Sequence, residues 1–137
     1  MLRPSWNKYF LDLAKLAATR STCGRKQVGC VLVRDKRVIA TGYNGSLPDK
    51  PHCDDVGHML EHGRCTRTVH AEANAVLQAA RFGISTDGCV AFCTTYPCWS
   101  CAKILVGAGI AEVVVAATGD YYNDPRVTEV GLTVIRA

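Results

Sequence analysis

The chain has 137 residues, of which 48% are hydrophobic and 20% are charged, and its formal net charge is +4. This length suits one domain with one core, and the composition excludes a disordered or repetitive chain. No stretch approaches the roughly 20 apolar residues of a membrane helix and no secretion signal is visible, so we expect no membrane partner. Because no export is expected, the eight cysteines should stay reduced, and they indicate metal binding or catalysis in preference to disulfides. We expect a cytoplasmic protein, in the host cytoplasm if it is viral.

The first predicted elements are a helix and a hairpin. After Pro4 the apolar residues recur at intervals of three and four, and the expected buried face consists of Trp6, Tyr9, Phe10, Leu13, Leu16 and Ala17. Two β-branched runs at 28–33 and 37–43 flank a short polar stretch and predict a β-hairpin. The sequence GYNG at 42–45 ends the second strand.

The remaining chain alternates helices and strands. Good helix formers at 70–82, followed by Gly83, predict a helix. Strands at 89–94 and 112–117 flank a helix from Cys98 to about residue 106, which implies parallel pairing through a crossover. A loop or short helix start at 119–126 precedes a last strand at 132–136. We therefore predict a single domain over 1–137 with a three-layer α/β/α fold, in which helices flank a mixed central sheet of about five strands.

A Cys/His-rich insert at about 46–69 interrupts this alternation. Its sequence HCDDVGHMLEHGRC, at 52–65, contains two cysteines and three histidines. Irregular segments of this length in a compact domain are usually functional or held by a metal.

Three soft ligands outside the insert predict a metal centre. Cys98 and Cys101 are three residues apart, so on the first turn of a helix they can bind one ion. The positive end of the helix dipole favours their thiolate forms. His70, at the start of the neighbouring helix, can complete a set of three ligands and leave the fourth tetrahedral position to water. Zinc held in this way lowers the pKa of bound water to roughly 7.

Glu72 follows His70 by two residues and is badly placed to bind the same ion from the same helix face. Its carboxylate can instead accept the water's proton and return it to a substrate ring nitrogen and a leaving amine. HAE at 70–72 followed by PCWSC at 97–101 fits the pattern of zinc-dependent nucleobase deaminases. Two other classes stay open: a thiol oxidoreductase that uses CxxC, and a non-catalytic zinc-binding module in which both Cys/His clusters are structural.

Four segments carry a resemblance to a known family: STCGRKQVGCVLV from residue 21, GYNGS from 42, TVHAEANAVLQAARFG from 68 and TTYPCWSCAKILVGAGI from 94. Over nearly its whole length the chain resembles the deoxycytidylate (dCMP) deaminases, within the zinc-dependent cytidine/deoxycytidylate deaminase family. The resemblance implies a cytidine-deaminase-like fold. It also implies a hydrolase that converts dCMP to dUMP and ammonia for thymidylate synthesis.

The resemblance assigns roles to matching residues. His70, Cys98 and Cys101 match the catalytic zinc ligands, and Glu72 matches the catalytic proton shuttle. A second, structural zinc is implied, with ligands Cys23, Cys53, His58 and Cys65, and with His62 as the alternative to His58. The expected substrate-binding residues are Asn44, Ala71, Asn74, Tyr96 and Tyr122. The alternative to substrate binding is an ordinary turn residue for Asn44 and a solvated helix position for Asn74.

Further expectations concern phosphate, effectors and partners. The mildly basic charge suits a phosphate-bearing ligand, and the candidates to bind it are Arg25, Lys26, Arg67, Tyr122 and Arg126. The resemblance implies a homo-oligomer, often a hexamer, that is activated by dCTP with Mg²⁺ and inhibited by dTTP. No concentrated basic patch is visible, so we do not expect a nucleic-acid partner. The nearest alternative is a deaminase of another cytosine or adenine substrate.

Overall fold

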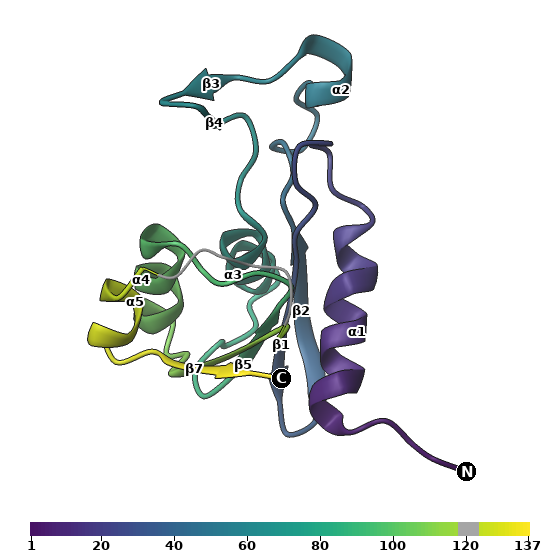
Figure 1. The fold of residues 1–137 in the computed structure, drawn as a ribbon, viewed down its shortest axis with the longest axis vertical. Helices are drawn as coiled ribbons and strands as arrows, with labels where there is room; N and C mark the ends of the chain where they lie inside the picture. The colour runs from purple at the N-terminus through teal and green to yellow at the C-terminus, as the bar shows by residue number, and fades with distance from the viewer. Residues whose placement is uncertain (118–123) are drawn as a thin grey trace.

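A computed structural model describes residues 1–117 and 124–137 of the chain (Figure 1). Its main sheet has the strand order β2 (Arg37–Tyr43), β1 (Gly29–Arg34), β5 (Val90–Cys93), β6 (Glu112–Val115) and β7 (Thr133–Arg136). β1 is antiparallel to β2 and β5, whereas β5, β6 and β7 are parallel. The principal helices are α1 (Trp6–Ala18), α3 (Ala71–Arg81) and α4 (Trp99–Gly107), and α5 (Arg126–Glu129) is a short one.

The helices cover both faces of the sheet: α1 lies on one face, and α3, α4 and α5 lie on the other (Figure 1). Successive side chains of a strand point to opposite faces, so Val31 and Val33 of β1 join one apolar cluster while Cys30 and Leu32 join another. The first cluster packs under α1 and includes Phe10 and Phe92. The second includes Leu105, Val113, Val127 and Leu132. The predicted three-layer α/β/α fold with a five-stranded mixed sheet is confirmed.

The buried face of α1 differs from the predicted one. It consists of Phe10, Leu11, Ala14 and Ala18. Trp6, Tyr9 and Leu16, which were predicted to be buried, are exposed. The reason is a close approach to the sheet, because a Cβ atom at Gly29 of β1 would collide with the backbone of Ala14 and Ala18. Small residues of α1 therefore face the strand at Gly29, whereas Trp6 and Tyr9 lie outside this contact.

α3 is held against β2 by a second close approach. A Cβ atom at Gly42 would collide with the backbone of Ala71 and Ala75, so only glycine lets the helix lie this near the strand. The helix begins at Ala71 with His70 as its N-cap residue, and Glu72 lies in its first turn. The contact at Gly42 therefore fixes the position of the two residues that the sequence singled out for catalysis.

The insert between β2 and α3 projects from the body of the molecule (Figure 1). It contains the one-turn helix α2 (Cys53–Val56) and a small sheet of β3 (Leu60–Glu61) and β4 (Arg64–Cys65). An isolated antiparallel bridge between Gly45 and Val69 closes its base. Within the described residues, no helix has the length and apolar character needed to cross a membrane.

Candidate active site and metal centres

Three soft ligands meet where α3 and α4 begin. His70 is the N-cap of α3, Cys98 is the N-cap of α4, and Cys101 lies in the first turn of α4. The His70 Nδ1 atom lies 3.5 Å from the Cys98 Sγ atom and 3.4 Å from the Cys101 Sγ atom. Usual bond lengths place nitrogen and sulfur ligands on a tetrahedral zinc ion about 3.6 Å apart. The structure therefore brings the predicted triad together at a spacing that fits one zinc ion.

Hydrogen bonds among the ligands give Cys98 thiolate character. Bonding with the Cys101 side chain, reinforced by His70, lowers the pKa of Cys98 to about 4. The Cys101 backbone N–H also donates to the Cys98 Sγ atom at 3.5 Å, as expected at a helix N-terminus. The same contacts with Cys98 raise the pKa of Cys101 and of His70. A divalent cation that binds this triad therefore displaces protons from it.

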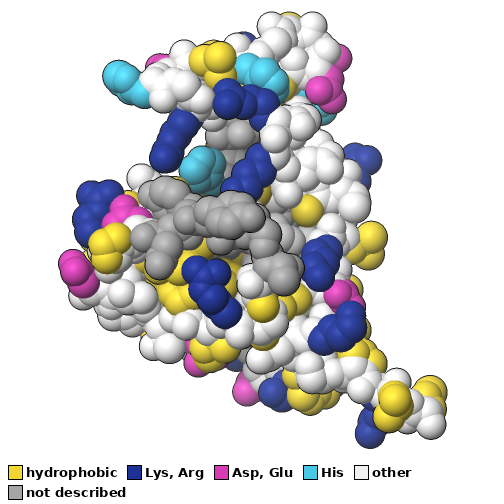
Figure 2. Space-filling view, in the orientation of Figure 1, with side chains coloured by type: hydrophobic (Ala, Val, Ile, Leu, Met, Phe, Trp, Pro, Cys, Tyr) yellow, Lys and Arg dark blue, Asp and Glu magenta, His cyan; other side chains and the backbone are white. Residues whose placement is uncertain are grey.

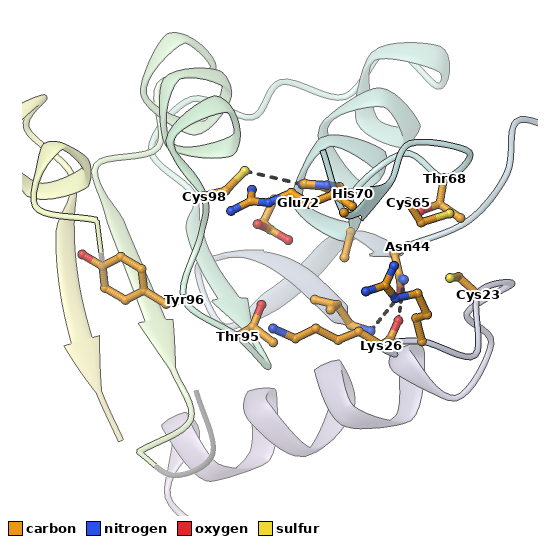
Figure 3. Close-up of a pocket in the computed structure, with 15 residues that line it drawn as sticks. Cys23, Lys26, Asn44, Cys65, Thr68, His70, Glu72, Thr95, Tyr96 and Cys98 are labelled. Carbon is orange, nitrogen blue, oxygen red and sulfur yellow. Dashed lines mark hydrogen bonds between the residues drawn. The ribbon is translucent and has the colours of Figure 1, made fainter. Parts of the chain in front are cut away.

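Glu72 is the buried acid beside the triad, with 3% of its surface exposed. It lines the same cavity as His70 and Cys98, and all three lie close together in Figure 3. It is not part of the three-ligand group itself. Burial raises the pKa of the Glu72 carboxyl group above its ordinary value. A carboxyl group tuned in this direction is suited both to accept and to return a proton.

The cavity in front of these groups has a volume of about 410 Å³, within the range of small-molecule sites. Of the predicted substrate contacts, Asn44, Ala71 and Tyr96 line it. Of the predicted phosphate contacts, Arg25 and Lys26 line it. The sequence did not single out other lining residues: Val28, Gly63, Arg64, Thr68 and Thr95. No spacing pattern identified them, because their place depends on how the insert and the strand ends fold together.

Asn44 forms part of the wall of the cavity that Glu72 also lines (Figure 3). Its Oδ1 atom accepts a hydrogen bond from the Val28 backbone N–H at 2.8 Å, and its Nδ2 atom donates to the Lys26 carbonyl oxygen at 2.6 Å. The buried amide thus holds the segment that enters β1. Asn44 therefore both lines the cavity and holds the neighbouring segment of the cavity wall in place.

Other predicted contacts lie away from this cavity. The Asn74 amide donates to the carbonyl oxygens of Tyr43 and Val69, at 2.8 and 3.3 Å, and thereby ties α3 to β2. Arg67 donates to the Gly57 carbonyl oxygen, and Arg126 forms an ion pair with Asp124. None of Asn74, Arg67 and Arg126 is among the residues that line this cavity, and a ligand contact at each stays a prediction. Tyr122 lies outside the described residues.

A second group of soft ligands consists of Cys23, Cys53, His58 and Cys65. The Cys23 Sγ atom lies 3.5 Å from the His58 Nδ1 atom, and the Cys53 and Cys65 Sγ atoms are 3.6 Å apart. These values are near the tetrahedral edges of about 3.6 and 3.8 Å that usual zinc bond lengths give. His62 is outside this group and lies in the turn between β3 and β4 with a φ of 51°. The four residues therefore fit a closed zinc site, with His58 as the histidine.

A buried carboxylate beside a His/Cys/Cys group at two helix starts is the arrangement of a zinc-dependent deaminase. The sequence profile of the "Cytidine and deoxycytidylate deaminase zinc-binding region" matches residues 4–117. The chain belongs to this cytidine and deoxycytidylate deaminase family. The predicted family and enzyme class, a zinc-binding deaminase and hence a hydrolase, are confirmed.

Individual relatives agree with this assignment. ComE operon protein 2 of Bacillus subtilis (strain 168) is 47% identical over 98% of this chain and 72% of that protein. Deoxycytidylate deaminase of Saccharomyces cerevisiae is 42% identical over 99% of this chain, which spans only 43% of the yeast protein. The crystal structure of dCMP deaminase from the cyanophage S-TIM5, in complex with dCMP and dUMP, matches with a TM-score of 0.83 and 27% identity, over 100% of both chains.

Proposed function

We propose that the chain hydrolyses dCMP to dUMP and ammonia and so supplies dUMP for thymidylate synthesis. The observation that carries the proposal is the presence of His70, Glu72 and Cys98 in one cavity, with Cys101 completing the ligand triad. Arg25 and Lys26 at the same cavity suit the charge of a monophosphate. The dCMP and dUMP bound to the structurally similar cyanophage enzyme support this choice of substrate.

Each residue of the site has its own task in this reaction. His70, Cys98 and Cys101 hold the catalytic zinc, which when bound supplies the Lewis acidity that makes water nucleophilic at neutral pH. Glu72 accepts one proton from the attacking water and delivers it to the cytosine ring nitrogen, and it then transfers the second proton, from the new hydroxyl group, to the leaving amine. Oxygen joins the ring carbon that carried the amino group, and the carbon–nitrogen bond breaks, which leaves uracil and ammonia.

The nucleotide is bound by residues that line the cavity around the triad. Asn44 and Tyr96, which are 8% and 5% exposed, and the fully buried Ala71 line this space and are our substrate contacts. The second group has four protein ligands and no position for water, so the zinc ion that it holds is structural and fixes the insert.

The proposal extends to assembly and regulation on the basis of the family resemblance. We expect one deaminase domain over residues 1–137 that assembles into a homo-oligomer such as a hexamer. We expect activation by dCTP with Mg²⁺ and inhibition by dTTP. Eight free cysteines agree with a reducing compartment and thus with the cytoplasm, or the host cytoplasm if the chain is viral.

The test is ammonia release by the zinc-loaded protein from dCMP, CMP, cytidine and tRNA at equal concentrations. We expect the highest kcat/KM with dCMP, an increase with dCTP and Mg²⁺, and a decrease with dTTP. A higher value with another substrate would assign a different deaminase activity. No release from any of them would favour the non-catalytic zinc-binding module, and an unchanged rate with both effectors would remove the regulatory part.

A further inference from the structure

The second Cys/His group lies beside the basic side chains of the cavity. Arg25 and Lys26 follow Cys23 by two and three residues, and Arg64 immediately precedes Cys65. All five of these residues line the one cavity that also contains Glu72. Figure 2 shows Lys and Arg side chains gathered around the hollow beneath the projecting insert. Two segments that are about forty residues apart in the chain thus bring positive charge to one place.

The ligand group is the link between these two segments. Cys23 contacts His58 of the insert at 3.5 Å, and Cys53 contacts Cys65 at 3.6 Å. The regular structure of the insert is small, because α2 has four residues and β3 and β4 have two residues each. Elements this short have little stability of their own.

Apolar packing provides little else to hold the hairpin. Val56, Met59 and Leu60 of the insert are all exposed, and none of them belongs to either apolar cluster. The position of Arg64 relative to Arg25 and Lys26 therefore depends on the Cys/His group. The catalytic triad does not depend on it, because His70, Cys98 and Cys101 lie at the helix starts of the body.

We infer that the second Cys/His group is a specificity device: by holding residues 23–26 against Arg64 and Cys65, it assembles a cationic wall that selects nucleoside monophosphates over nucleosides. This inference rests on the proposed function, because it assumes that a pyrimidine nucleotide occupies the cavity. A nucleotide and its nucleoside share base and sugar and differ only in the phosphate. Guanidinium groups recognise phosphate oxygens through charge-assisted hydrogen bonds, which the nucleoside cannot form.

The first test compares binding of the product dUMP with binding of its nucleoside, deoxyuridine, because neither carries the amino group that the reaction removes. Calorimetry would give both Kd values for the zinc-loaded wild type, for His58→Ala and for the matched control His62→Ala. We expect two zinc ions per chain in the wild type and in H62A, and one in H58A. In H58A the Kd for dUMP should rise about tenfold or more while that for deoxyuridine stays unchanged. Unchanged binding of deoxyuridine also shows that the body is folded.

The second test removes the charge and keeps the metal. Arg64→Gln should retain both zinc ions and weaken dUMP binding about tenfold, with no effect on deoxyuridine. Lys50→Gln changes a cation of the same insert that does not line the cavity, and it should bind both ligands as the wild type does.

The inference is overturned by any of four results. These are a wild type without preference for dUMP, an H58A variant that keeps both zinc ions, an H58A variant with one zinc and an unchanged preference, and an R64Q variant that binds dUMP normally. Failure of the proposed function has a different signature. In that case the wild type would prefer dUMP to deoxyuridine, and the preference would respond to H58A and R64Q, but dCMP would release no ammonia.

Discussion

Asn44 shows how a residue of the cavity wall can also stabilise the fold. Its buried amide satisfies the Val28 N–H and the Lys26 carbonyl oxygen, at 2.8 and 2.6 Å. Both backbone groups belong to the segment that leads from the second Cys/His group into β1. The sequence analysis gave a substrate contact or an ordinary turn residue for Asn44, and the structure adds a stabilising role that neither alternative contained.

Replacement of Asn44 by alanine should therefore lower the free energy of unfolding. A buried backbone group that loses its partner costs about 1–3 kcal/mol, and the bond to the Lys26 carbonyl oxygen is only partly buried, so we expect a total loss of about 2–4 kcal/mol in urea denaturation. The control is Asn7→Ala on the exposed face of α1, for which the change should stay within about 0.5 kcal/mol. Equal stability of N44A and N7A would contradict this role.

The grouping of the candidate catalytic residues was predictable because each pair lies within one turn of a helix start. His70 and Glu72 belong to one helix start and Cys98 and Cys101 to another, so local spacing defined their geometry. The choice between His58 and His62 was not predictable in this way. It depends on the path of the insert, whose short elements carry no periodic signal. Arg64 was missed for the same reason.

At the scale of elements, the contact between β2 and α3 positions the active site. Gly42 allows the backbone of α3 to approach the strand at Ala71, which immediately follows the candidate zinc ligand His70, and at Ala75. Asn74 reinforces the contact with its hydrogen bond to the Tyr43 carbonyl oxygen. A displacement of α3 would move His70 and Glu72 relative to the two cysteines of α4.

Gly42→Ala should therefore destabilise the protein and impair the site. Its methyl group would overlap backbone atoms that cannot rotate away, and overpacking of this kind costs about 1–3 kcal/mol. We expect a lower denaturation midpoint and a lower affinity of the His70 site for zinc. Gly107→Ala is the matched control, because a Cβ atom there has open space at the end of α4 and should be neutral or slightly stabilising. A G42A variant as stable as G107A would contradict the role of the close approach.

The order of the elements was largely predictable from sequence, whereas their packing was less so. Hydrophobic periodicity and terminal glycines predicted the bounds of α3, α4 and the five strands to within a few residues. The predicted buried face of α1 was wrong. The apolar spacing favoured Trp6 and Tyr9, whereas the close approach to Gly29 of β1 places Ala14 and Ala18 against the sheet. Close approaches between elements that are distant in sequence have no signature within either element.

At the scale of the whole molecule, one cavity lies between two groups of soft ligands with different tasks. The triad of the body leaves a position for water and has a buried acid beside it. The four-ligand group closes its shell and holds the insert, which contributes Arg64 and Thr68 to the cavity wall. In the proposed function, the helix starts of the body carry out the chemistry, and the insert, ordered by the proposed structural zinc, selects the substrate.

In the proposed function, Glu72 moves protons beside a zinc ion that three protein ligands hold. The most direct measurement is the rate of ammonia release from dCMP by zinc-loaded Glu72→Gln. We expect both zinc ions to be retained and kcat to fall by about 10²–10⁴-fold, the usual contribution of general acid–base catalysis. Turnover at the wild-type rate, with both zinc ions in place, would contradict the account.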